Sequence, residues 1–113
     1  MPKSLSILSP PGVSLFEATY SGVDVYELIV NGHSLMRRRD DSWVNATHIL
    51  KIANVEKGRR TKILEREVHH EQHEKVQGGY GKYQGTWIPC ERARSLARDF
   101  QVYDYCASIL DLP

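Results

Sequence analysis

Gln77 and Gln84 flank a glycine-rich segment, Gly78-Gly79-Tyr80-Gly81, with six residues between the two glutamines. A side-chain amide offers a donor and an acceptor together, so it can pair with adenine in the major groove of DNA or accept a hydrogen bond from guanine N2 in the minor groove. Glycines supply the positive φ that a tight reversal needs, and a slim tip suits a narrow groove. Two glutamines that face the same way could therefore read two neighbouring G·C pairs of a CG step. The alternative is that both are solvent-exposed strand residues.

Basic residues beside this tip could hold an anionic backbone. Residues 75–89 contain Lys75 and Lys82 but no carboxylate, and Tyr83 follows Lys82. We expect Lys75, Lys82 and Tyr83 to contact phosphates on either side of the tip, with Gly78 entering the groove.

A second basic cluster lies upstream, in the sequence KGRRTK. Its cations are Lys57, Arg59, Arg60 and Lys62. They fall near the start of an expected helix, where free N–H groups and the helix dipole favour phosphate. A solvated basic face is the plain alternative. In one alternative this helix enters the major groove and reads bases itself. In the other, its cations hold phosphates while the glutamines read the bases. The sequence does not decide between the two.

The preceding helical segment offers three more polar candidates. Thr47 and Lys51 share a face at i, i+4 spacing, and Lys51 is expected to contact phosphate. His48 fits either core packing or an approach to DNA.

The charge distribution favours one localised docking face. The chain has 113 residues with a net charge of +1, but residues 37–62 carry eight basic residues against three acidic ones. A protein that coats polyanions indiscriminately would be basic throughout. No run of 18 apolar residues occurs, so we expect no membrane span. Cys90 and Cys106 are expected to be reduced thiols of a cytosolic or nuclear protein.

Two other functions compete with nucleic-acid binding. His69 and His73 would share a helical face, as zinc ligands do, but no second ligand pair follows them, so we expect no metal and no cofactor. A protein-interaction module that presents the hairpin to an acidic partner is the other alternative. We expect no enzyme, because the chain has neither a glycine-rich phosphate loop before a helix nor a recognisable nucleophile.

The order of elements that must position these residues predicts an α+β fold. Strands are expected up to residue 39, with a turn at Asn31-Gly32. Asn45 is expected to cap a helix over 46–53, and a second helix over 57–68 completes a helix-turn-helix. The hairpin, with strands 74–77 and 82–88 around a four-residue tip, is then a wing, and two helices over 91–100 and 102–110 end the chain. Residues 1–15 are expected to be a flexible arm and residues 16–113 a single domain.

Two long motifs add a family resemblance. The segments DSWVNATHILK (41–51) and HEKVQGGYGKYQGTWIP (73–89) resemble the APSES domain, a relative of the KilA-N domain, and most closely that of the DNA-binding subunits of the fungal G1/S complex that acts at Mlu cell-cycle boxes. The resemblance covers residues 18–112. It implies a winged helix-turn-helix, a nuclear location and binding to double-stranded DNA with a CGCG core. It also implies a regulatory partner subunit bound through regions absent from this chain, which is expected to be an N-terminal DNA-binding fragment.

Overall fold

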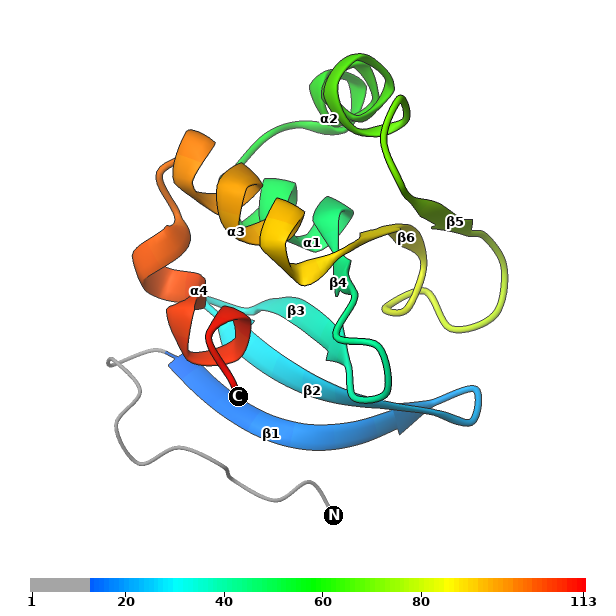
Figure 1. Ribbon diagram of the computed structural model, residues 1–113, viewed down its shortest axis with the longest axis vertical. Helices are drawn as coiled ribbons and strands as arrows, with labels where there is room; N and C mark the ends of the chain where they lie inside the picture. Colours follow the sequence, from blue (N-terminus) through cyan, green and yellow to red (C-terminus); the bar gives the residue numbers. More distant parts are fainter. Residues whose placement is uncertain (1–12) are drawn as a thin grey trace.

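Six antiparallel strands form one sheet, in the order β1-β2-β3-β4-β6-β5, in the computed structural model, which describes residues 13–113 (Figure 1). The strands are β1 Val13–Tyr20, β2 Val23–Val30, β3 His33–Arg38, β4 Val44–Asn45, β5 Glu74–Val76 and β6 Gly85–Ile88. The predicted turn at Asn31-Gly32 is confirmed, because both residues have positive φ (49° and 84°) and Val30 pairs with His33. β1 begins at Val13, so the predicted boundary of the arm at residue 15 is wrong. The rest of the predicted arm lies outside the described residues.

The helices follow the predicted order. They are α1 Ala46–Ile52, α2 Lys57–Ile63 with a π-helical continuation η1 Leu64–Val68, α3 Cys90–Asp99 and α4 Tyr103–Leu110. Asn45 caps α1, since its Oδ1 accepts a hydrogen bond from the backbone N–H of His48 at 3.2 Å. Asn54 ends the first helix segment with φ 61°, a left-handed conformation that asparagine tolerates. The helix-turn-helix prediction is therefore confirmed.

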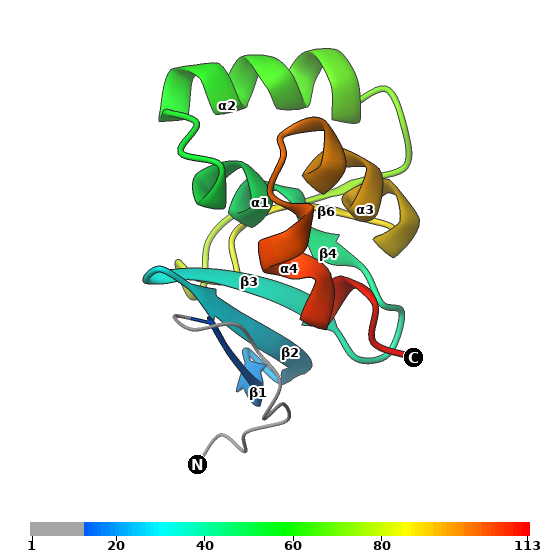
Figure 2. The ribbon, with the colours of Figure 1, turned by 90° about the vertical axis from the view of Figure 1, so that its left-hand side faces the viewer.

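The main core lies between the sheet and the helices α1, α3 and α4 (Figure 2). Alternation along β2 sends Leu28 and Val30 into this core and Val25 and Glu27 to the opposite face of the sheet. Each face of the strand is therefore buried against a different part of the molecule.

A second, smaller core lies under the wing. It consists of Val25, Met36, Tyr83 and Trp87, and Trp87 is fully buried at the base of the wing. The wing is thus packed onto the sheet, and the predicted winged helix-turn-helix of the α+β class is confirmed.

Neither cysteine is in a disulfide bond: Cys90 is half-buried and Cys106 is buried. Among residues 13–113, no helix has the length and apolar character that crossing a membrane requires.

Candidate nucleic-acid interface

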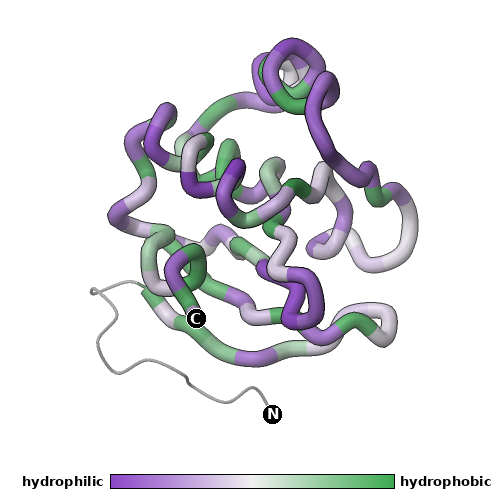
Figure 3. Tube along the Cα trace, in the orientation of Figure 1, coloured by the Kyte–Doolittle hydropathy of each residue, from purple (hydrophilic) through white to green (hydrophobic). Residues whose placement is uncertain are grey.

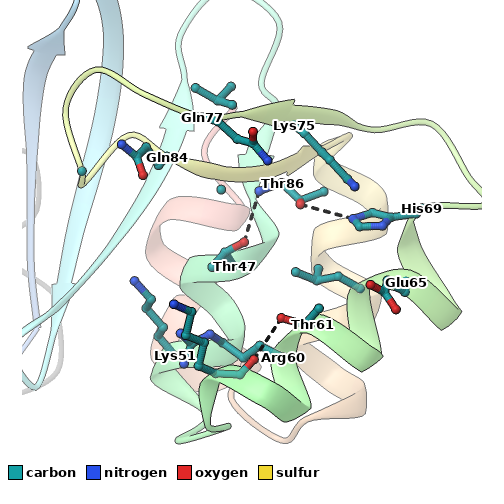
Figure 4. Close-up of a pocket in the computed structure, with 15 residues that line it drawn as sticks. Thr47, Lys51, Arg60, Thr61, Glu65, His69, Lys75, Gln77, Gln84 and Thr86 are labelled. Carbon is teal, nitrogen blue, oxygen red and sulfur yellow. Dashed lines mark hydrogen bonds between the residues drawn. The ribbon is translucent and has the colours of Figure 1, made fainter.

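An open groove of about 530 Å³ separates the helix-turn-helix from the wing (Figure 4). α1, α2 with η1, and the wing each contribute to its walls. It gathers these predicted contact residues: Thr47, Lys51, Lys57, Arg60, Lys75, Gln77 and Gln84. Segments far apart in the sequence therefore meet at one surface. Two of them, α2 and the segment leading to β5, are mostly hydrophilic (Figure 3).

The four cations of the groove are available to a ligand. Among residues 13–113, no carboxylate lies within 4.0 Å of the charged nitrogens of Lys51, Lys57, Arg60 or Lys75. Arg60 is held in place because its Nη1 donates to the carbonyl oxygen of Val55 at 2.9 Å. Unpaired positive charges around a concave surface attract an anion.

Other predicted contacts lie outside the groove. Arg59 and Lys62 are exposed on α2 without lining it, and Gly78 is exposed on the wing with φ 82°. Lys82 is also exposed, but its Nζ lies 3.7 Å from the carboxylate of Glu27. These residues could contact DNA only beyond the groove's walls.

The connection between the wing strands is longer than predicted. β5 ends at Val76 and β6 begins at Gly85, so the predicted return strand from Lys82 and the four-residue tip are wrong. Core side chains bind the three carbonyl oxygens just before Gly85: His48 Nε2 binds that of Lys82 (2.7 Å), Trp87 Nε1 that of Tyr83 (3.0 Å) and Asn45 Nδ2 that of Gln84 (2.9 Å). The backbone before Gly85 is therefore fixed by the core rather than by a partner strand.

The glutamines lie at the two ends of this connection. Gln77 is exposed and Gln84 is half-exposed, and both line the groove (Figure 4). Gln84 Nε2 makes one long hydrogen bond, 3.4 Å, to the carbonyl oxygen of Gly79. Both amides thus remain open to a further partner.

Of the two possibilities for His48, the structure shows core packing, because the residue is buried. The backbone N–H of Met36 donates to Nδ1 at 3.2 Å, which leaves the ring proton on Nε2 to be donated to the carbonyl oxygen of Lys82. Burial lowers the pKa of His48 to about 4, and the charges of Lys51 and Lys82 act in the same direction. His48 is a neutral link between β3 and the wing.

The prediction that Tyr83 contacts a DNA phosphate is wrong, because the residue is buried. It is 8% exposed, and its ring centroid lies 4.6 Å from that of Trp87. Thr47 keeps its place in the groove, but its hydroxyl already accepts a hydrogen bond from the backbone N–H of Thr86 at 3.1 Å. Both residues help to attach the wing to the body.

His69 and His73 do not converge on a common ligand position. Their rings stack with centroids 4.9 Å apart and an interplanar angle of 27°. No group of three histidine, cysteine or acidic residues suited to a metal occurs within the part of the chain that the structure describes. His69 instead lines the groove, where burial and then the charges of Lys75 and His73 hold its pKa below the usual value.

Sequence reasoning missed several residues of this surface. Thr61, Glu65, His69 and Thr86 also line the groove. The i, i+4 spacing of Lys57, Thr61 and Glu65 was a usable signal, since it places the three on one helical face. Nothing local in the sequence indicated that Glu27 is buried beside the wing.

The family was identified by comparison with known proteins. A family model described as the KilA-N domain matches residues 27–111, most of the described chain. The chain belongs to the KilA-N family. This chain is 59% identical over 97 residues to the transcription factor MBP1 of Saccharomyces cerevisiae, an alignment that covers 86% of this chain and 12% of MBP1. It is 52% identical to the cell division cycle-related protein res1/sct1 of Schizosaccharomyces pombe, with 86% of this chain and 15% of that protein covered.

A solved structure described as a DNA complex of PCG2 shares the fold. Its TM-score is 0.86 at 53% identity, and the match covers 90% of this chain and 91% of that one. The aligned part of this chain spans only about an eighth of the length of MBP1. MBP1 is named as a transcription factor and not as an enzyme.

Proposed function

We propose that this KilA-N domain binds double-stranded DNA in a sequence-specific manner and recognises a CGCG core. The observation that carries the proposal is that Gln77 and Gln84 line the same groove as four cations that, within residues 13–113, have no carboxylate within 4.0 Å. Amides can discriminate bases, whereas Lys and Arg bind phosphates regardless of sequence. One surface thus offers both kinds of contact.

The two kinds of contact come from different elements. Lys57 and Arg60 of α2 and Lys51 of α1 line the groove wall that faces the wing, where they are placed to hold a phosphate backbone. Lys75 supplies a cation from the wing itself, next to Gln77. We infer that the helix-turn-helix and Lys75 fix the position of the duplex, while the glutamines of the wing read its bases.

The similar proteins support the wider role that we propose. MBP1 is named as a transcription factor, and the PCG2 structure is described as a DNA complex. Together with the resemblance of residues 41–51 and 73–89, they support a nuclear transcription factor that controls G1/S genes through an ACGCGT-type box. A regulatory partner subunit would bind elsewhere, through regions that the longer relatives have and this chain does not span.

A mobility-shift titration tests the proposal with a CGCG duplex and a scrambled duplex of equal length. We expect Gln77→Ala and Gln84→Ala each to weaken binding to the CGCG duplex by about tenfold, with little change on the scrambled duplex. Equal losses on both duplexes would contradict base reading. If the wild-type domain showed no salt-dependent binding to either duplex, the protein-interaction alternative would replace DNA binding.

A further inference from the structure

The buried carboxylate of Glu27 lies directly beneath the wing. Glu27 is fully buried on β2, and its two oxygens accept hydrogen bonds from the hydroxyls of Tyr20 (2.5 Å) and Ser34 (2.7 Å). Burial and the Glu27 carboxylate raise the pKa of the Tyr20 hydroxyl above its usual value, so Tyr20 remains a donor. A buried carboxylate is costly unless it is paired and hydrogen-bonded. The one cation within 4.0 Å of it, among residues 13–113, is Lys82 of the wing.

The same part of the wing rests on the β1–β2 hairpin at two further points. The ring of Tyr80 meets that of Tyr20 edge-on, with centroids 5.9 Å apart. A Cβ at Gly79 would lie 3.7 Å from Ser21 Oγ, so the glycine backbone lies close to the turn after β1. Glu27 and Tyr20 therefore form the floor on which the wing segment 79–82 sits.

We propose that Glu27 is a positioning residue for DNA recognition: through the Lys82 ammonium it fixes the wing in the arrangement that presents Gln84 to the groove. This inference rests on the proposed function. Lys82 is suited to the link, because its side chain is 61% exposed and its ammonium has three N–H donors. One donor can face Glu27 while another faces a phosphate. A wing fixed in advance loses less conformational entropy on binding.

The effect expected of Glu27 is opposite to that of an isolated negative charge near DNA. Removing an acidic residue from a DNA-binding domain should strengthen binding, since it removes repulsion of phosphates. Glu27→Gln keeps the size of the side chain and removes the charge that attracts Lys82. Its amide keeps one acceptor oxygen and gains an NH2 donor, so one of the two hydroxyls must turn to accept. We expect this variant to bind the CGCG duplex more weakly, by about tenfold.

The matched control is Glu17→Gln. Glu17 lies on β1, is partly exposed and pairs with Arg39 at 3.5 Å, so the control makes the same charge change outside the wing's floor. It should leave affinity unchanged or increase it slightly. If Glu27 acts through Lys82, the losses of Glu27→Gln and Lys82→Met should be less than additive in the double variant. Fully additive losses, or equal or tighter binding by Glu27→Gln, would overturn the inference.

Hydrogen exchange of the free protein separates this inference from the proposed function. The backbone N–H groups of Tyr83 and Gln84 donate to the carbonyl oxygens of Tyr80 (3.0 Å) and Gly81 (3.3 Å) inside the wing. In Glu27→Gln they should exchange several-fold faster, while amides of α1 and α3 keep their rates. Unchanged wing rates would refute positioning by Glu27 even if the wild type binds DNA. If Glu27→Gln does not fold, Lys82→Met must show the same faster exchange. Wild-type exchange rates in Lys82→Met would then refute positioning by Glu27.

Discussion

The side chain of Asn45 joins the helix-turn-helix to the backbone of Gln84. Its Oδ1 caps α1, and its Nδ2 donates to the carbonyl oxygen of Gln84 at 2.9 Å. One side chain thus determines both where α1 begins and where a predicted base-reading residue is held. The position of the wing relative to the helix-turn-helix depends on this contact.

Gly85 is the position where this contact is most vulnerable. Its φ is 144°, and a Cβ there would lie 2.4 Å from Asn45 Oδ1. We expect Gly85→Ala to lower the free energy of unfolding by about 2 kcal/mol or more, through backbone strain and displacement of Asn45. Urea unfolding measures this. Gly81→Ala is the matched control, because a Cβ at Gly81 meets nothing within 4 Å, and it should change stability far less. Equal effects would show that the Asn45 contact is unimportant.

The glutamines should read the minor groove, because guanine N2 is a donor there and the amide oxygen of a glutamine can accept from it. Replacing guanine by inosine in the CGCG core removes the N2 amino group and leaves the major-groove edge intact. We expect wild-type affinity, measured by fluorescence anisotropy, to fall by about tenfold on that duplex. The Gln77→Ala/Gln84→Ala double variant should not distinguish the two duplexes. A loss with 7-deazaguanine but none with inosine would place the glutamines in the major groove.

Lys75 should contribute affinity without specificity. It lines the groove, and in the described part of the chain no carboxylate lies within 4.0 Å of its ammonium, so a phosphate is a suitable partner. We expect Lys75→Ala to weaken binding to CGCG and scrambled duplexes equally and to reduce the slope of log K against log salt by about 0.9. Arg98→Ala, on α3 outside the groove, is the control and should leave the slope unchanged. An unaltered slope for Lys75→Ala would mean that Lys75 meets no phosphate.

Local sequence signals predicted the elements well, and long-range contacts explain where prediction failed. The Asn31-Gly32 turn, the Asn45 cap and the left-handed Asn54 follow from neighbouring residues, and all three are present. The start of β6 did not follow, because the side chains of His48 and Asn45, 34 and 39 residues away, bind the carbonyl oxygens of Lys82 and Gln84. A polar side chain in a motif does not reveal whether its partner is DNA or the protein.

The roles of individual site residues also depend on long-range contacts. His48 and Tyr83 are polar and adjoin predicted contacts, but both are buried and hold the wing. Lys51, Lys75 and the glutamines reach the groove, as expected from their charge and spacing. Glu27 lies on β2, where successive side chains point to opposite faces of the sheet. It is buried because the wing covers its face of the sheet, which the local sequence does not indicate.

His48 should make stability and wing attachment depend on pH. Its pKa is about 4 in the folded protein, whereas the ordinary value of 6.5 applies to the unfolded chain. Between these two pH values the folded state keeps the ring neutral while the unfolded state takes up a proton. The stabilisation is complete above pH 6.5 and is lost as the pH falls from 6.5 to 4, by an amount on the order of 3 kcal/mol. Protonation of Nδ1 would also break the hydrogen bond from the Met36 N–H.

His48→Gln separates this effect from the protonation of carboxylates. Glutamine is uncharged at every pH and can still donate to the carbonyl oxygen of Lys82 and accept from Met36. We expect the wild type to be the more stable protein at pH 7.5, and its advantage in urea unfolding to shrink steadily toward pH 4. An NMR titration of the wild-type ring should give a midpoint near 4. A constant difference between the two proteins across this range would mean that His48 is no less readily protonated when folded, and that its link to the wing is not sensitive to pH.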